Sequence, residues 1–525
     1  MMRKKMHLKL ALTSLTMLLA IPVSTAFATS SYITPNEHFE VRNYAGNQVP
    51  ALVDGSLAES SFHSPTSIEQ LSNGHYIISD TLNHTIRLVE QQKVDSFAGL
   101  PIGYDNYSFA IGAYSDGVAL EAAFNMPLGL AVDSQDNIYV ADSGNHVIRK
   151  ITKDGEVTTV AGTTVLGHRD GKANSAQFNL PSDVAIDSQG NLYVADTLNH
   201  AIRKINPSGE VITLNALSTR VVEYTPGYAD FSGDFADGAL AIAKFNEPTH
   251  IEVDSKDNLY VTDSGNQRIR YIDLQSNTVT TVAGSGLLAA NELYVEPGYK
   301  DGKADEARFN SPEGIALVND TTLLVADRNN HVIRVIEDGV VKTIAGIGEQ
   351  YGGTNGVLSA ATFNQPYDVF VTGDGALLVA DSGYNRLKIV ASYLHFAEAT
   401  DINHLQIVVN GKVLQANDQP FIVSGRTVLP LRSIGEALGL EVSYDPQTKQ
   451  IKLAAQNAEY IFNVDSNQAA IVENGEVTHV ELDVSVQLKN GVSFIPVRFI
   501  SEQLGYDVIW DKDMQNVVIR NLTIN

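Results

Sequence analysis

The stretch Ala141-Asp142-Ser143-Gly144-Asn145-His146-Val147-Ile148-Arg149 is repeated almost unchanged 54 positions later, from Ala195 to Arg203. The chain has 525 residues, and weaker copies of the same pattern occur on both sides of these two. Because self-similarity at a fixed spacing is the signature of a repeat protein, the repeats are considered first.

Six copies can be aligned on three markers. Each copy has a Phe-x-x-Pro segment. A Gly stands ten positions before the Pro and is itself preceded by Asp or Asn. An Asp stands fifteen positions after the Pro. The six prolines are Pro65, Pro127, Pro181, Pro248, Pro312 and Pro366, and the six later aspartates are Asp80, Asp142, Asp196, Asp263, Asp327 and Asp381. A cation follows each of these aspartates by seven positions, as Arg87, Arg149, Arg203, Arg270, Arg334 and Lys388.

Each copy contains short runs rich in Val, Ile and Tyr, separated by Asp, Asn and Gly, which is typical of strands joined by turns. Four such runs per unit, with no helical periodicity, predict the blades of an all-β, six-bladed β-propeller over residues 39–392. The sixth copy lacks a fourth strand, whereas residues 39–46 resemble one. We therefore expect the N-terminal strand to complete the last blade, which would remove an exposed sheet edge.

The segments Ala141–Arg149 and Ala195–Arg203 resemble the NHL (Asn-His-Leu) repeat family of six-bladed propellers. The resemblance implies the fold but not one activity. Propellers of this kind include modules that bind proteins or RNA, and also amidating lyases and lactone hydrolases.

A second duplication follows a linker predicted at residues 393–403. Arg426–Gly439 matches Val492–Gly505 at an offset of 66, and each copy predicts a strand, a short helix that begins after a Pro, a Gly stop and a strand pair. This small duplicated α+β domain, expected at residues 404–522, resembles the copper amine oxidase N-terminal-like or stalk domain. An amine oxidase needs three His ligands for copper, and this stretch contains only His404 and His479. We therefore expect a spacer or an adhesive module without copper oxidation.

The first 28 residues have a basic start, an apolar run and an Ala-Phe-Ala end, and so predict a secretory signal peptide.

The chain has no Cys and carries 61 acidic against 36 basic residues, a net charge of −25. Such an acidic chain is a poor partner for nucleic acid. We expect a monomer without a transmembrane segment, secreted, extracellular or attached to the cell wall. A protein, a peptide or a cell-wall glycan would be its partner.

The repeated Asp-x-x-Asn-His turns raise the question of metal binding. Equivalent residues of a ring lie a blade apart, so we expect the Asp and Asn to stabilise the turns and the repeated Arg to connect blades.

The residues two and four positions after each Pro are more informative, because they should face the channel. There Asp183, His250, Glu252 and Asp368 depart from the small residues of most copies. These four side chains either form hydrogen bonds to water in the channel or bind a divalent cation there. We expect no cofactor, and a divalent cation in the channel is the alternative.

Three long loops between blades carry the other candidates. They are rich in Tyr, and we expect them on the channel-mouth face as a binding surface. The candidate residues are Tyr104, Tyr107, Tyr114, Tyr224, Tyr228, Tyr294 and Tyr299. The sequence thus favours a non-catalytic binding or scaffold protein, and the alternative is a metal-dependent lyase or hydrolase with its site at the channel mouth.

Overall fold

The computed structural model describes residues 39–225, 227–393, 405–414, 419–455, 458–473, 475–504, 506–511 and 515–521. The predicted signal peptide and nearly all of the predicted linker lie outside these residues. No helix in the described part of the chain is long and apolar enough to cross a membrane.

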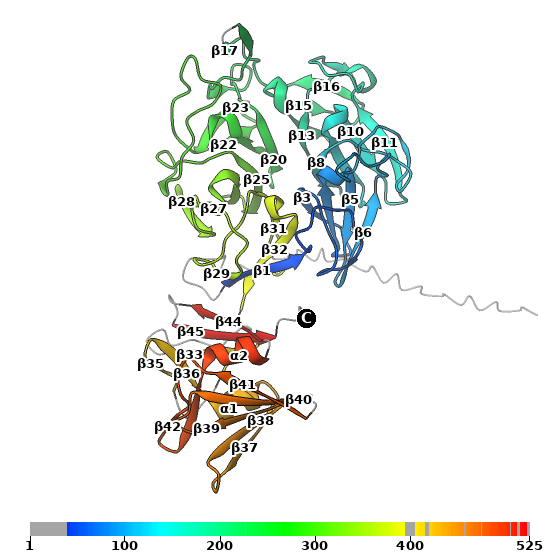
Figure 1. Ribbon diagram of the computed structural model, residues 1–525. Coiled ribbons are helices and arrows are strands. Elements are labelled where there is room, and N and C mark those ends of the chain that lie inside the picture. Colours follow the sequence, from blue (N-terminus) through cyan, green and yellow to red (C-terminus); the bar gives the residue numbers. More distant parts are fainter. Residues whose placement is uncertain are drawn as a thin grey trace, which may run out of the picture. The chain divides into compact units, whose positions relative to one another are not determined.

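The predicted propeller is present, with one five-stranded antiparallel sheet per repeat. The innermost strand of every blade begins at the repeat proline, which lacks an N–H for sheet pairing and so suits a strand start. These strands are β3 (Pro65–Gln70), β8 (Pro127–Val132), β13 (Pro181–Ile186), β20 (Pro248–Val253), β25 (Pro312–Asn319) and β30 (Pro366–Val371). They surround the centre in Figure 1, and each contacts the innermost strand of the next blade, with β30 contacting β3.

The second strands end at the repeat aspartates: β4 (Tyr76–Asp80), β9 (Ile138–Asp142), β14 (Leu192–Asp196), β21 (Leu259–Asp263), β26 (Thr322–Asp327) and β31 (Leu377–Asp381). A 3-10 turn follows each: η1 (Thr81–Asn83), η2 (Ser143–Asn145), η4 (Thr197–Asn199), η5 (Ser264–Asn266), η6 (Arg328–Asn330) and η7 (Ser382–Tyr384). The third strands are β5 (Thr85–Val89), β10 (Val147–Ile151), β15 (Ala201–Ile205), β22 (Arg268–Asp273), β27 (Val332–Glu337) and β32 (Arg386–Ser392).

The fourth strands are β6 (Lys93–Ala98), β11 (Glu156–Ala161), β16 (Glu210–Thr213), β23 (Thr278–Ala283) and β28 (Val340–Ala345). The structure adds a two-residue outer strand that begins at each repeat glycine: β2 (Gly55–Ser56), β7 (Gly117–Val118), β12 (Gly171–Lys172), β19 (Gly238–Ala239), β24 (Gly302–Lys303) and β29 (Gly356–Val357). A short 3-10 turn, η3 (Ala173–Ser175), follows β12. A hairpin of β17 (Val221–Thr225) and β18 (Tyr228–Phe231) extends the long loop between the third and fourth blades.

The predicted closure of the ring is confirmed. Strand β1 (Phe39–Ala45) takes the fourth place of the last blade, between β32 and β29 (Figure 1). Its Val41 pairs with Val390 and is fully buried in the core of that blade. The two ends of the propeller chain are therefore joined by backbone hydrogen bonds within one sheet.

The C-terminal domain has the predicted duplicated arrangement. Strand β36 (Arg426–Pro430) precedes helix α1 (Leu431–Ala437), and β43 (Val492–Pro496) precedes α2 (Val497–Leu504). These two duplicated strands pair antiparallel at the centre of a sheet, with β35 (Phe421–Val423) and β42 (Gln487–Lys489) outside them. Val428, Leu429 and Ile495 are fully buried, so the two copies share one core.

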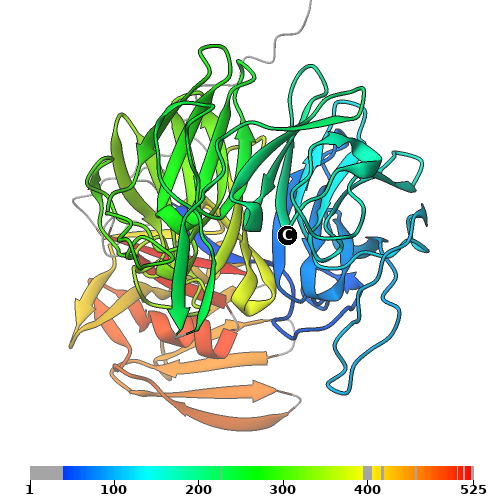
Figure 2. The same cartoon turned by 90° about the horizontal axis from the view of Figure 1, so that it is seen from above.

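Two further sheets complete this domain. One holds β33 (Gln406–Val409), β34 (Lys412–Val413), β44 (Tyr506–Asp511) and β45 (Asn516–Asn521). The other is an antiparallel meander, whose strands lie side by side in orange in Figure 2: β37 (Glu441–Asp445), β38 (Gln450–Ala454), β39 (Ala458–Asn463), β40 (Gln468–Glu473) and β41 (Glu476–Glu481).

Candidate functional site

The repeated aspartates and arginines form a buried network inside each blade. In the first blade, Asp80 accepts hydrogen bonds from the backbone N–H of His63, from Asn83 and from Arg87. Arg87 is fully buried, also donates to Asp54, and lies over the Phe62 ring. The expectation of a structural role is confirmed, but the arginine bonds within its own blade, so its predicted role between blades is wrong.

One hydrogen bond recurs at every junction between blades, and it is made by the residue that follows each 3-10 turn. His84, His146, His200 and His331 have a left-handed backbone and accept through Nδ1 a hydrogen bond from the residue before the next blade's proline, at 2.9–3.1 Å. Gln267 and Asn385 do the same through side-chain oxygens. The left-handed residue of each turn is therefore the one that follows the repeat Asn, or Tyr384 in the last blade, and not the repeat Asn itself. Each histidine therefore has a local structural role.

Two of the four predicted channel residues, Asp183 and His250, lie side by side. Asp183 Oδ2 lies 3.4 Å from Nδ1 of His250, and Asp183 and Asp368 are both buried. Each carboxylate accepts the backbone N–H of the next blade's innermost strand, Ile251 for Asp183 at 2.8 Å and Ile68 for Asp368 at 2.9 Å. A Cβ on Gly129 would collide with Asp183, so a glycine at that place makes room for the carboxylate.

Burial perturbs the titration of this group strongly. Desolvation raises the pKa of Glu252 to about 8, helped by the charge of Asp368, and raises that of Asp368 to about 7. It lowers the pKa of His250 to about 4. Glu69, which sequence reasoning placed in the channel but did not select, has its pKa raised by burial and by the charges of Glu252, Asp368 and Asp183. Glu69 therefore joins the four predicted residues, and at neutral pH the shifted pKa values favour a protonated Glu252 and a neutral His250 imidazole.

A cation is one possible occupant of such a group, because Oδ1 of Asp183 is buried without a hydrogen-bond partner among the described residues. However, the part of the chain that the structure describes contains no group of three or more His, Asp or Glu side chains arranged to hold a metal ion. The backbone bonds of Asp183 and Asp368 also direct one oxygen of each toward the neighbouring strand. The metal site stays a prediction. Burial raises the pKa of these carboxyls and favours their protonated forms, whereas the backbone N–H bonds to Asp183 and Asp368 act in the opposite direction.

The first long loop, between the first and second blades, presents a cluster of exposed apolar side chains. Between Leu100 and Ile111 it exposes six apolar side chains, with Tyr107 at 80% and Ile102 at 67% exposure; the others are Leu100, Tyr104, Phe109 and Ile111. Sequence reasoning selected its two tyrosines and missed the other four. The alternation of apolar residues with Gly and Asp could have indicated them.

This loop is a braced hairpin. The backbone N–H of Ile102 donates to the carbonyl oxygen of Ile111, and that of Ile111 donates to the carbonyl oxygen of Gly103. Asp105 Oδ1 accepts the N–H groups of Tyr107 and Phe109. The Phe109 ring packs on His63 with centroids 4.9 Å apart, and Nε2 of His84 lies 3.2 Å from the Ala110 carbonyl oxygen. The exposed side chains are thus held on a fixed support beside the first blade's turn.

The other predicted tyrosines have mixed positions. Tyr114 and Tyr299 lie over Arg149 and Arg334, and their hydroxyls bond Thr159 and Thr343, so both pack a blade. Tyr294 is half-exposed and donates to Glu247 at 2.9 Å. The side chains of Tyr224 and Tyr228 lie outside the described part of the structure.

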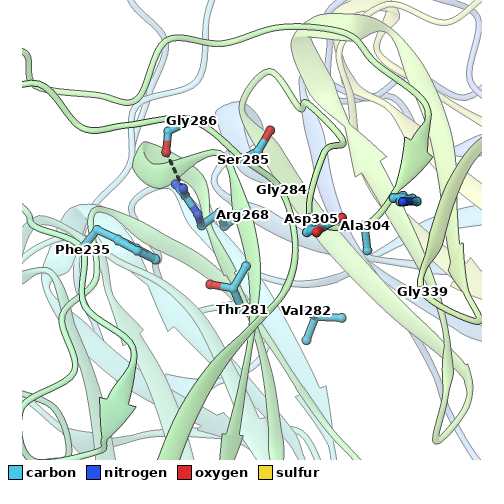
Figure 3. A pocket seen from close by; sticks show the side chains of 11 residues that line it. Phe235, Arg268, Thr281, Val282, Gly284, Ser285, Gly286, Ala304, Asp305 and Gly339 are labelled. Atoms are coloured by element: carbon cyan, nitrogen blue, oxygen red, sulfur yellow. Dashed lines mark hydrogen bonds between the residues drawn. The ribbon is translucent and has the colours of Figure 1, made fainter.

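A hollow of about 520 Å³ lies between the fourth and fifth blades (Figure 3). Arg268 enters it, but its guanidinium lies 4.2 Å from the centroid of the Phe235 ring and donates to the carbonyl oxygens of Asn266 and Gly286. Since the chain itself holds this cation, the hollow does not present it to a ligand.

Comparisons with known proteins agree with this architecture. Residues 408–519 match the copper amine oxidase N-terminal domain, residues 167–350 the teneurin NHL domain, and residues 124–151 an NHL repeat. The human NHL repeat-containing protein 2 is 28% identical over 391 residues, which is 70% of this chain and 51% of that protein. Human teneurin-4 is 30% identical over 236 residues, 42% of this chain and 8% of its own length. The chain thus spans about half of the length of NHL repeat-containing protein 2 and a much smaller share of the length of teneurin-4.

Among solved structures, one similar chain is described as an auxiliary nutrient binding protein from Bacteroides ovatus. It has a TM-score of 0.48 and 16% identity, and the match covers 68% of this chain and 77% of that one. A streptogramin B lyase structure has a TM-score of 0.39 and 11% identity, covering 67% of this chain and 97% of the other.

Proposed function

We propose that the protein is a non-catalytic binding protein whose propeller engages a partner protein or peptide through the loop Leu100–Ile111. The observation that carries this proposal is the exposure of six apolar side chains on one braced hairpin. Clustered exposed apolar residues on a rigid scaffold are the usual basis of a protein interface.

The composition of the loop favours a polypeptide over a sugar. Sugars are bound by aromatic rings together with polar side chains, whereas this hairpin combines Tyr104, Tyr107 and Phe109 with the aliphatic Leu100, Ile102 and Ile111. Its carboxylate, Asp105, is already engaged by backbone N–H groups. Burial of aliphatic and aromatic surface together is typical of the core of a protein interface.

The negative charge of the chain favours a basic polypeptide partner over an acidic one. With a net charge of −25 the protein attracts a basic partner over a distance and repels an acidic one. We therefore propose a partner segment with apolar side chains flanked by Lys or Arg. The basic start and apolar run of residues 1–28 support a location outside the cytoplasm, where the C-terminal domain acts as a spacer or attachment module.

Selection of peptides from a random displayed library on the immobilised protein tests the proposal. We expect enriched peptides to be apolar and basic, and to bind at least tenfold more weakly when Tyr104 and Tyr107 are both replaced by Ser. The control variant Tyr444→Ser changes an exposed tyrosine of the C-terminal domain and should bind like the parent. Peptides that bind the double variant undiminished would place the site elsewhere.

A further inference from the structure

The residues that line the channel in the first three blades are matched by those of the last three. The innermost strands of the first and fourth blades both begin with Pro-Thr-x-Ile-Glu, at Pro65–Glu69 and Pro248–Glu252. Two positions after the Pro, the second and fifth blades both carry Gly, and the third and sixth both carry Asp, as Asp183 and Asp368. The channel therefore has an approximate twofold symmetry that relates each blade to the one three places further on.

The hydrogen bonds in the structure follow the same symmetry. In each half, the Asp accepts the backbone N–H of the Ile in the next blade, Ile251 for Asp183 and Ile68 for Asp368. In each half, a Cβ on the Gly of the preceding blade would collide with the Asp carboxylate. The two carboxylates therefore occupy equivalent positions on β13 and β30, which are fixed by the strands on either side.

Four carboxyl groups lie in this channel at two levels. The innermost strands contact one another in ring order, so β3 is opposite β20 and β13 is opposite β30. This order puts Glu69 and Glu252 on opposite sides of the channel, and Asp183 and Asp368 likewise. The Glu residues stand two positions further along their strands than the Asp residues, and two residues of a strand span about 6–7 Å. Each level therefore has one carboxyl group on each side.

These carboxyl groups lack a compensating charge. No Lys or Arg among the residues that the structure describes forms an ion pair with any of the four, and His250 beside Asp183 is neutral because burial lowers its pKa to about 4. Oδ1 of Asp183 is also buried without a hydrogen-bond partner among these residues, beside the channel position Gly129. Solvent reaches the group, since the His250 side chain is 16% exposed. A small cation from solvent would therefore find acceptors that the protein leaves unused.

The arrangement suits an organic cation better than a metal ion. A divalent metal ion needs several ligand oxygens that converge within about 2.0–2.6 Å. No group of three or more His, Asp or Glu side chains in the described part of the chain is arranged in that way. An ammonium group instead donates N–H bonds over about 2.7–2.9 Å, so it fits between more widely separated carboxyls. The other side chains of the Glu level are apolar, and a methylene chain can pack on them: Ala131, Ala185, Ala316 and Phe370.

We propose that the channel binds a short aliphatic diamine. One ammonium group bonds Asp183 and Asp368, the other bonds Glu69 and Glu252, and the methylene chain between them spans the two levels. A chain of about four carbons between the two nitrogens has this length. The site is separate from the loop Leu100–Ile111, so the diamine is a second ligand and not the partner of the proposed interface.

Isothermal titration calorimetry of the full chain with 1,4-diaminobutane tests the proposal. We expect saturable binding with one diamine per chain. Butylamine has the same carbon chain but one ammonium group, like a lysine side chain, and should bind at least tenfold more weakly. Glu69→Gln with Glu252→Gln keeps the size of both side chains and should also weaken diamine binding at least tenfold. The control, Glu121→Gln with Glu210→Gln, removes the same charge from exposed positions and should bind the diamine like the parent.

Thermal melting verifies that both double variants are folded. If the diamine shows no saturable binding at millimolar concentration, the proposal is wrong. Equal affinity for butylamine would indicate a site for a single ammonium group, such as a lysine of a partner protein, and displacement of the diamine by an equal concentration of Ca²⁺ would indicate a metal site; either result overturns it. Equal loss of affinity in both double variants would mean general attraction to the acidic chain and would also overturn it.

Discussion

Oδ1 of Asn385 accepts a hydrogen bond from the backbone N–H of Ser64 at 2.9 Å, which connects residues 321 positions apart. It is the last of six equivalent bonds that run from each blade's turn to the proline segment of the next blade. Together with strand β1 in the last blade, this bond closes the ring. The propeller is therefore held by the same local bond at every blade junction, including the one where the chain ends meet.

Removing one of these bonds should destabilise the propeller measurably. His84→Ala leaves the N–H of Met126 without its acceptor and places Ala at a positive φ, so we expect a loss of about 1–3 kcal/mol in the free energy of unfolding. His84→Asn keeps an acceptor, as Asn385 does in the last blade, and should recover most of that loss. Urea unfolding of the three proteins measures the difference. Equal stability of His84→Ala and the parent would show that the bond contributes nothing.

Strand β1 should be needed by the whole ring. Deleting residues 29–46 removes the fully buried Val41 and uncovers the edge of β32. We expect the melting temperature to fall by roughly 10 °C or more, or the cooperative transition to disappear. Deleting 404–525 should leave the propeller folded. A 29–46 deletion that melts like the parent would contradict the closure.

The fold could be predicted from the sequence because each repeat marker has one physical role that is satisfied locally. Pro begins the innermost strand of each blade. Asp80 and its equivalents accept hydrogen bonds from the turn residues, and the Arg seven positions later is buried inside the blade. The sixth copy even changes two markers together: Asn355 replaces the Asp that elsewhere pairs with the Arg, and Lys388 replaces that Arg. In the structure Lys388 Nζ binds carbonyl oxygens, including that of Thr362 at 2.8 Å, while Arg386 binds Asp381.

The channel carboxyls make stability depend on pH in a definite direction. Burial raises the pKa of Glu252 from 4.5 to about 8, so between these values the folded state holds a proton that the unfolded state has lost. Stability is therefore greatest at the acidic end of this range and decreases as the pH rises toward 8. His250, with its pKa lowered to about 4, opposes this trend only below pH 6.5.

We therefore expect the parent to lose more stability than Glu252→Gln between pH 6.5 and 8.5, by about 2 kcal/mol. Urea unfolding at both pH values measures this, and the exposed Glu121→Gln serves as a control. An identical pH dependence in the parent and in Glu252→Gln would show that Glu252 is ionised throughout.

Chelation tests the alternative occupant of the channel. If the carboxyls hold protons, treatment with a chelator, or addition of Ca²⁺ or Zn²⁺, should leave the melting temperature unchanged. A bound ion would instead stabilise the fold by roughly 2–4 kcal/mol when its concentration is far above its dissociation constant. A decrease of several degrees with chelator, absent in His250→Ala with Asp183→Asn, would support the metal-dependent lyase or hydrolase.

The candidate sites could be predicted only in part. Positions two and four after each Pro located Asp183, His250, Glu252 and Asp368, because the strand period places them on one face. The same rule cannot tell a protonated carboxyl from a cation ligand, since that depends on burial and on backbone bonds from the next blade. Tyr107 and Tyr114 look alike in the sequence, yet Tyr107 is 80% exposed and Tyr114, at 43%, packs on Arg149, because only Tyr114 stands two positions before a repeat Asp.

Amide hydrogen exchange, with and without a selected apolar and basic peptide, tests the central claim most directly. If the loop Leu100–Ile111 is the binding surface, the hydrogen-bonded amides of Ile102, Asp105 and Ile111 should exchange at least tenfold more slowly in the complex. The amides of the C-terminal domain should not change. Protection that is confined to the channel strands or to the C-terminal domain, with unchanged exchange in this loop, would contradict the account.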